Sequence, residues 1–164
     1  MLTYEVSLMF RIMFVCHGNI CRSPMAEFIF KDMIQKQGIA DEFTVLSSAT
    51  STEEICNGIG NPVYPPAKAE LARHGISCSG KRAVQLRKSD YSKYDLFVCM
   101  DSANVRNALR ILGNDIENKV CKLMSFTEKG GDVADPWYTD RFDVAYSDIY
   151  EGCKLLLQKI KNRH

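Results

Sequence analysis

The strongest constraint on the fold of this chain is one short stretch between an apolar run and a helix-like run. It reads Cys16-His17-Gly18-Asn19-Ile20-Cys21-Arg22-Ser23-Pro24. A cysteine and an arginine separated by five residues can close a loop whose backbone N–H groups point inward. Such amides and a following helix N-terminus attract oxyanions and favour the thiolate form of a cysteine. The stretch therefore predicts a cradle for a phosphate-sized dianion.

The residue types in this loop suit the same chemistry. The planar fork of Arg22 can bind two phosphoryl oxygens at once. Gly18 allows a close approach or a positive φ, and Asn19 tolerates the left-handed region. Ser23 can cap the helix or donate a hydrogen bond to the sulfur of Cys16. We expect Cys16 and Arg22 to be catalytic. The residues expected to bind phosphate are His17, Gly18, Asn19, Ile20, Cys21, Arg22 and Ser23.

A second element is Asp135-Pro136-Trp137-Tyr138. Phosphoryl transfer to a thiolate requires a proton for the leaving oxygen, and a carboxylic acid on a mobile loop is a common donor. Gly130-Gly131 gives the loop freedom, while Pro136 stiffens the turn after Asp135. We expect Asp135 to be the general acid. Trp137 and Tyr138 form either a wall against an aromatic substrate ring or ordinary cover for the core.

The run from Val15 to Ser23, V-C-H-G-N-I-C-R-S, resembles the low-molecular-weight protein tyrosine phosphatase family. The later Asp135 followed by proline and two aromatic residues strengthens this resemblance. It implies a phosphatase I-like fold and hydrolysis of phosphotyrosine through a phosphocysteine on Cys16. The expected substrate is a phosphotyrosyl protein or a small aryl phosphate. No cofactor or metal is expected, because Arg22 and the loop amides supply the positive charge.

Apolar runs that alternate with helical patterns predict an α/β fold. We expect a single four-stranded parallel sheet of order 2-1-3-4 with helices on both faces, which puts the Cys16 loop at its carboxyl edge. Residues 1–10 are expected to be an N-terminal extension of uncertain structure, and residues 11–164 a single phosphatase domain. Strands are expected over 11–15, 43–46, 94–100 and 119–123. Helices are expected from about 24 to a stop at Gly38, over 67–74, from 102 to Gly113, and from 142 onward.

Supporting residues follow from the resemblance. The segment 47–66 is rich in Ser, Thr, Gly, Asn and Pro and is predicted to be a long loop. Ser48 either helps to hold the phosphate loop or is a solvated turn serine. His74 either orients Asn19 or is favoured in the last helical turn by the helix dipole alone.

The cleft differs from the family pattern at one point. The family usually carries an aromatic residue shortly after the supporting serine, whereas this chain has Glu53 and Glu54. Carboxylates near the mouth of the cleft would repel acidic peptides and favour basic ones.

Composition excludes several other classes. The chain has 164 residues, 46% of them hydrophobic, and a net charge of +1, which gives no electrostatic signal for nucleic acid or an acidic membrane. No apolar run reaches the length of a membrane span, and the three histidines are dispersed. Seven cysteines are an odd count, which argues against a secreted disulfide framework. We expect a cytoplasmic and mostly monomeric protein.

Cys21 lies close enough to Cys16 in the loop to form a disulfide with it after oxidation. This spacing, together with the family resemblance, gives the hypothesis of reversible redox protection.

Three alternative functions remain open. Arsenate reductases of the same fold share a similar loop but shuttle oxidation to further cysteines, for which Cys99 is a candidate. Protein-arginine phosphatases characteristically carry threonine where this chain has Ile20. A non-catalytic phosphate-binding module would have no use for Cys16 and Asp135 together.

Overall fold

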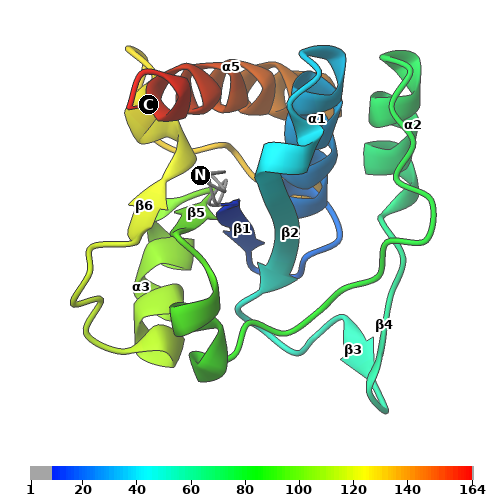
Figure 1. Cartoon of the computed structure of the whole chain (residues 1–164). Coiled ribbons are helices and arrows are strands. Elements are labelled where there is room, and N and C mark those ends of the chain that lie inside the picture. Colours follow the sequence, from blue (N-terminus) through cyan, green and yellow to red (C-terminus); the bar gives the residue numbers. More distant parts are fainter. Residues whose placement is uncertain (1–8, 164) are drawn as a thin grey trace.

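Four parallel strands make the central sheet of this α/β protein (Figure 1). The computed structural model describes residues 9–163, and the sheet has the order β2-β1-β5-β6. Counting only the strands of this sheet gives 2-1-3-4, so the predicted single α/β domain with a parallel sheet is confirmed. The strands are β1 (Phe10–Cys16), β2 (Phe43–Ala49), β3 (Ile55–Cys56), β4 (Ile59–Gly60), β5 (Leu96–Cys99) and β6 (Val120–Lys122). The helices are α1 (Arg22–Lys36), α2 (Pro65–Arg73), α3 (Ser102–Leu112), α4 (Pro136–Thr139) and α5 (Phe142–Lys161), with 3-10 turns at Ala40–Glu42, Lys88–Lys93 and Leu123–Phe126.

The central strand, β1, carries the apolar run that precedes Cys16. Ile12 and Phe14 belong to the larger of two buried clusters, whereas Met13 and Val15 belong to the smaller one. Because successive side chains of a strand point to opposite faces, the two clusters are the two faces of the sheet. A run buried on both faces is typical of the middle of a parallel sheet.

Helices cover both faces, as predicted. The larger cluster joins the sheet to α1 and α5 through side chains such as Phe30 and Ile149. The smaller cluster joins it to α3 through Ala108 and Leu112. In Figure 1, α5 crosses one side of the sheet beside α1, and α3 lies on the other side. The helix α2 packs against α1 and α5.

The N-terminal boundary lies slightly earlier than the sequence suggests. β1 begins at Phe10, so this residue belongs to the sheet and not to the predicted extension over residues 1–10. Residues 1–8 of that extension lie outside the described residues.

The segment 47–66 is more ordered than predicted, and its assignment as one long loop is wrong. β2 continues to Ala49, and β3 and β4 form an antiparallel hairpin. Asn57 and Gly58 connect them with φ values of 52° and 77°. Asn-Gly between alternating apolar residues is the usual signal of a two-residue hairpin turn, because both positions require positive φ. This signal was present in the sequence.

The strand order places β1 at a topological switch point. β2 pairs with one side of β1 and β5 with the other, so the loops that follow β1 and β5 meet at the carboxyl edge of the sheet. Open α/β sheets bind ligands at such a point. Cys16 ends β1, and Asp101 follows β5 at the same edge.

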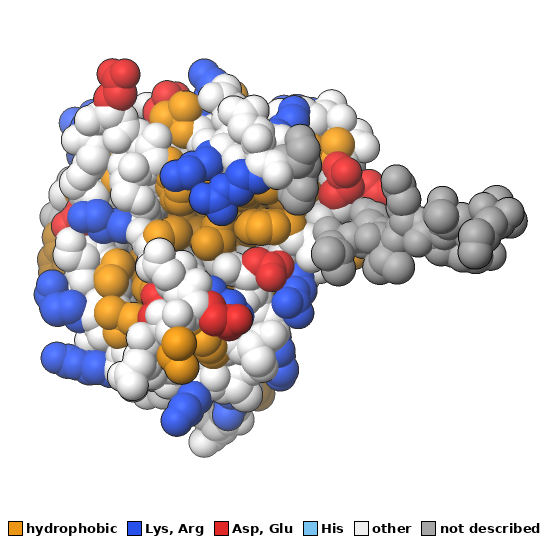
Figure 2. Space-filling view, turned by 60° about the vertical axis from the view of Figure 1, so that its left-hand side comes forward, with side chains coloured by type: hydrophobic (Ala, Val, Ile, Leu, Met, Phe, Trp, Pro, Cys, Tyr) orange, Lys and Arg blue, Asp and Glu red, His pale blue; other side chains and the backbone are white. Residues whose placement is uncertain are grey.

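The surface is of mixed character. On the face in Figure 2, acidic and basic side chains are interspersed among hydrophobic ones. Within residues 9–163, no helix is both long enough and apolar enough to cross a membrane.

Candidate active site

The sulfur of Cys16 lies at the floor of the loop between β1 and α1. The backbone N–H of Asn19 donates to Cys16 Sγ over 3.3 Å, and Ser23 Oγ lies 2.9 Å from the same sulfur. Ser23 Oγ also accepts a hydrogen bond from Asn19 Nδ2 over 2.8 Å, so its own hydrogen is free for Cys16. Two donors therefore converge on the sulfur and stabilise a negative charge there.

Asn19 holds the shape of this loop. It is buried and takes the left-handed conformation with a φ of 59°, so the residue with positive φ is Asn19 and not Gly18. Its Nδ2 donates to Ser47 Oγ over 2.9 Å, and its Oδ1 accepts from the backbone of Val84 over 3.0 Å. The Asn19 side chain thus ties the loop to β2 and to the connection between α2 and β5, in which Val84 lies.

The serine that supports the loop is Ser47, and the prediction of Ser48 is wrong. Neighbouring residues of a strand point to opposite faces, so a shift of one residue changes the partner completely. Ser48 is buried in β2, and its hydroxyl has no hydrogen-bond partner. It is therefore not a solvated turn serine either.

The prediction that His74 orients Asn19 is also wrong. His74 follows the last residue of α2, and its ring stacks on Tyr146 of α5 with centroids 3.7 Å apart. Its Nε2 lies 3.4 Å from Glu70 Oε1. Because α2 packs against α5, the end of the helix directs this ring away from the loop.

Two supporting residues were missed. Glu27 in α1 is 2% exposed; its Oε1 accepts from Ser47 Oγ over 2.6 Å and its Oε2 from Lys31 Nζ over 2.6 Å. Lys81 Nζ donates to the backbone oxygen of Ser47 over 3.0 Å and lies 3.5 Å from Glu27 Oε1. Burial lowers the pKa of Lys81, although the Glu27 carboxylate opposes this. A helical glutamate and a loop lysine look exposed in sequence, so no pattern signals this buried pair.

Arg22 opens α1, and its guanidinium is anchored from several sides. Nη1 donates to Asp101 Oδ2 over 2.7 Å and to the backbone oxygen of Val133 over 2.8 Å. Burial works against the charged form, yet negative charge on Cys16, together with Asp101, raises the pKa of Arg22 above its usual value. The cation is therefore permanent and fixed beside the sulfur.

Asp135 faces this guanidinium across the cleft. It is the N-cap of α4, where its Oδ1 accepts from the backbone of Trp137 over 3.0 Å. Its Oδ2 lies 3.5 Å from Arg22 Nη2. One oxygen is thus used to fix the side chain, and the other points into the site.

The cleft above the sulfur encloses about 430 Å³. Its lining consists of Cys16, His17, Gly18, Asn19, Ile20, Cys21, Arg22, Glu53, Glu54, Asp135, Trp137 and Tyr138. The structure therefore brings together every predicted phosphate-binding and cleft residue except Ser23, which lies beneath the sulfur. Trp137 is supported from behind by Tyr64, with ring centroids 5.0 Å apart. Trp137 and Tyr138 are largely exposed, so they form a wall of the cleft and not core cover.

Cys21 shares the cleft with Cys16. Burial and the negative charge of Cys16 raise the pKa of the Cys21 thiol to about 12. Cys21 is therefore protonated at neutral pH and does not compete with Cys16 for a phosphoryl group. In the described part of the chain, no group of three or more His, Cys, Asp or Glu side chains has a metal-binding arrangement.

Fold and site together define a class. A parallel sheet with a cysteine at the end of its central strand, followed by an anion-binding loop, an arginine and a facing aspartate, is the arrangement of cysteine-dependent phosphatases.

Comparison with known proteins gives the family within this class. A family profile described as low molecular weight phosphotyrosine protein phosphatase matches residues 11–164. The chain is 34% identical to the low molecular weight protein-tyrosine-phosphatase YfkJ of Bacillus subtilis, over 93% of this chain and 97% of the relative. It is 36% identical to the human low molecular weight phosphotyrosine protein phosphatase, over 90% of this chain and 94% of the relative. The crystal structure of YfkJ superposes with a TM-score of 0.88, covering 94% of this chain and 96% of that one. The chain belongs to the low molecular weight phosphotyrosine protein phosphatase family, and the resemblance seen in the sequence is confirmed.

The two neighbouring serines of β2 give a matched test of the site. We expect Ser47→Ala to lower kcat/KM for an aryl phosphate by about tenfold, since an unsatisfied buried polar group costs about 1–3 kcal/mol and here would loosen Asn19. Ser48→Ala, which breaks no hydrogen bond, should stay within about twofold. Steady-state kinetics of both variants measures this. A larger loss in Ser48→Ala than in Ser47→Ala would contradict the assignment.

Proposed function

We propose that this protein hydrolyses phosphotyrosine in proteins, or small aryl phosphates, through a phosphocysteine on Cys16. The observation that carries the proposal is the placement of one sulfur beneath a fixed guanidinium and opposite a fixed carboxyl group. Cys16 Sγ receives hydrogen bonds from the Asn19 amide and the Ser23 hydroxyl. This arrangement suits a nucleophile for phosphorus, and family membership supports the same activity.

In the first step, the Cys16 thiolate attacks phosphorus in line with the leaving oxygen. A sulfur–phosphorus bond forms while the bond between phosphorus and the tyrosyl oxygen breaks, and Asp135 gives its proton to that oxygen. Arg22 and the loop amides bind the equatorial oxygens. Because these donors are already oriented, they stabilise the charge of the transition state without reorganising.

In the second step, water attacks the phosphocysteine. The Asp135 carboxylate accepts a proton from the water, the sulfur–phosphorus bond breaks, and inorganic phosphate leaves. The hydrogen bond from Ser23 stabilises the returning thiolate. The site ends in its starting state.

The surroundings of the site favour an aromatic substrate. Trp137 and Tyr138 present rings along one side of the cleft. Aromatic rings prefer offset-stacked or edge-to-face contacts with each other, which a phosphotyrosine side chain could make. Ile20 gives an apolar loop position where protein-arginine phosphatases characteristically have threonine. Cys99 is fully buried in β5, and burial raises its pKa, which argues against a shuttle of the arsenate reductase type.

We also propose a cytoplasmic location and activity as a monomer. All seven cysteines are free, which suits a reducing compartment. One chain supplies every residue of the proposed site.

A substrate panel tests the function. We expect turnover of p-nitrophenyl phosphate and phosphotyrosine, and rates at background for phosphoarginine and for arsenate with thioredoxin. Cys16→Ser should abolish turnover, because a serine hydroxyl is not ionised at neutral pH, while the exposed Cys56→Ser should remain active. Faster turnover of phosphoarginine than of phosphotyrosine would replace the proposal with the protein-arginine phosphatase alternative.

The acid assignment has its own signature. Asp135→Asn should lower kcat for phosphotyrosine by about 10²–10⁴-fold, as expected when a general acid is lost. The loss should be smaller for p-nitrophenyl phosphate, because its leaving group needs less protonation. The control is Asp140→Asn, since Asp140 is an exposed residue in the left-handed region that asparagine tolerates. Equal losses for both leaving groups would contradict the assignment.

We also propose that Cys21 protects Cys16 from oxidation. Peroxide would oxidise the Cys16 thiolate to a sulfenic acid, and Cys21 would condense with it to a disulfide with loss of water. After mild peroxide, intact-mass analysis should find a loss of two hydrogens, and a thiol reductant should restore activity. Cys21→Ser should instead accumulate irreversibly oxidised Cys16. An unbridged Cys16 in the oxidised wild-type protein would overturn this role.

A further inference from the structure

Two carboxylates form a wall at the mouth of the cleft. Residues Glu53 and Glu54 line the cleft on the segment between β2 and β3. Backbone hydrogen bonds tie this segment to the phosphate loop, from Thr50 N to Cys16 O over 3.0 Å and from Ser51 N to His17 O over 3.0 Å. The wall therefore moves with the loop and not as a free surface segment.

Each carboxylate also contacts a neighbouring side chain. Glu53 Oε2 lies 3.0 Å from His17 Nε2. Glu54 Oε2 accepts from Asn61 Nδ2 over 2.7 Å, and the two backbones are joined by a bond from Asn61 N to Glu54 O over 2.8 Å. Gly18 leaves room for the Glu54 side chain, since a Cβ at position 18 would lie 3.2 Å from Glu54 Cγ.

The charge of the cleft changes from floor to mouth. Among the described residues that line the cleft, one is a lysine or arginine, namely Arg22. It is buried at the floor, where a bound phosphoryl group would neutralise its charge. Further out, Glu53 and Glu54 lie at the rim, and His17 is the basic group beside them. The lining also includes the uncharged rings of Trp137 and Tyr138. Once phosphate is bound, the mouth presents net negative charge to whatever flanks the phosphotyrosine.

We propose that Glu53 and Glu54 select phosphotyrosyl segments that carry lysine or arginine next to the phosphotyrosine. This inference rests on the proposed function and names the class of substrate for the same site. Attraction between opposite charges strengthens binding of a basic flank, and like-charge contact weakens binding of an acidic one. Each carboxylate has a partner that orients it, Asn61 for Glu54 and His17 for the more exposed Glu53, and this reduces the side-chain entropy lost on binding.

The experiment compares three phosphotyrosyl peptides that are identical except for lysine, alanine or glutamate on both sides of the phosphotyrosine. One solvent-exposed charge pair changes a rate by a factor of a few. The lysine peptide gains attraction and the glutamate peptide suffers repulsion, so we expect kcat/KM for the lysine peptide to exceed that for the glutamate peptide by about tenfold. Raising the salt concentration to about 1 M should reduce this ratio toward one, because the Debye length falls to about 3 Å.

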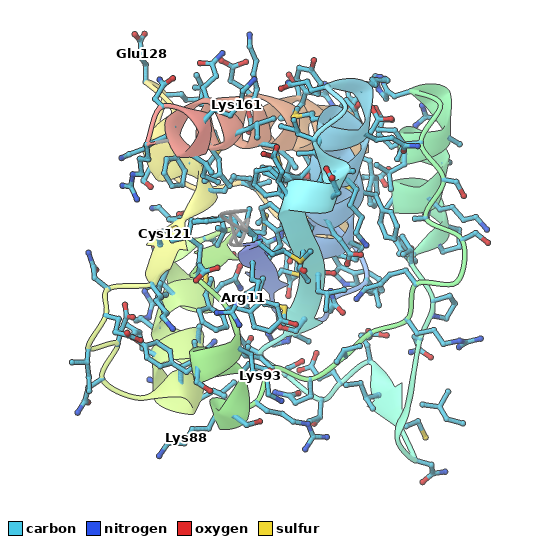
Figure 3. The ribbon with its side chains drawn as sticks, in the orientation of Figure 1. Arg11, Lys88, Lys93, Cys121, Glu128 and Lys161 are labelled. Carbon is cyan, nitrogen blue, oxygen red and sulfur yellow. The ribbon has the colours of Figure 1, made fainter. Side chains whose placement is uncertain are left out.

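Variants assign the preference to the wall. In Glu53→Gln/Glu54→Gln the amide oxygens can still accept from His17 and Asn61, so the fold is kept while the charge is lost. The ratio between the lysine and glutamate peptides should fall to within about twofold in this variant. Glu53→Lys/Glu54→Lys, which makes the rim positive, should invert the preference. The matched control is Glu128→Gln, because Glu128 is exposed and lies at the opposite corner of the molecule from the hairpin (Figure 3); it should keep the wild-type ratio.

The outcomes separate this inference from the proposed function. A wild-type protein that cleaves all three phosphotyrosyl peptides at equal rates would overturn the inference and leave the proposed function standing. A preference that persists in Glu53→Gln/Glu54→Gln would also overturn it. A protein that turns over none of the peptides and no phosphotyrosine would overturn the proposed function itself.

Discussion

The side chain of Asn19 is the point on which the phosphate loop depends. It is buried, it takes a left-handed backbone, and its amide reaches Ser23, Ser47 and the backbone of Val84. These three partners come from the start of α1, from β2 and from the long connection to β5. A side chain with both donors and an acceptor is needed to satisfy all of them, which neither aspartate nor leucine could do. The shape of the anion cradle is therefore set by one amide.

The buried charges around this amide are paired, both beneath the phosphate loop and at the floor of the cleft. Beneath the loop, Glu27 is buried with Ser47 and Lys81, so the negative charge of a buried carboxylate is compensated. At the floor of the cleft, Arg22 is held by Asp101 and compensated further by the sulfur. Buried charges are tolerated only when they are paired in this way. The network therefore fixes positions at the site more than it adds stability.

The sequence predicted the parts of the structure that depend on local patterns. The buried run of β1 and the alternation of strand and helix patterns predicted the α/β class, the family resemblance implied the order of the strands, and the spacing from Cys16 to Arg22 predicted the loop. The prediction was wrong where a single residue of register decides the partner, as for Ser47 and Ser48, because a strand exchanges its faces at every residue. It was wrong for His74 because the packing of α2 on α5 decides where that ring lies. It missed Glu27 and Lys81, since only tertiary contacts distinguish a buried ion pair from two surface charges.

The segment that carries Glu53 and Glu54 is attached to the phosphate loop through main-chain atoms of Thr50 and Ser51. Main-chain hydrogen bonds are the same for almost every residue type, so they place no demand on the side chains of this segment. New residues could be introduced at the rim, and the hairpin beyond it could be lengthened, without disturbing the geometry around the sulfur. Such an attachment separates the chemistry of the enzyme from its choice of partner, and it makes this rim a suitable place for evolution, or for an engineer, to redirect the same reaction to another protein.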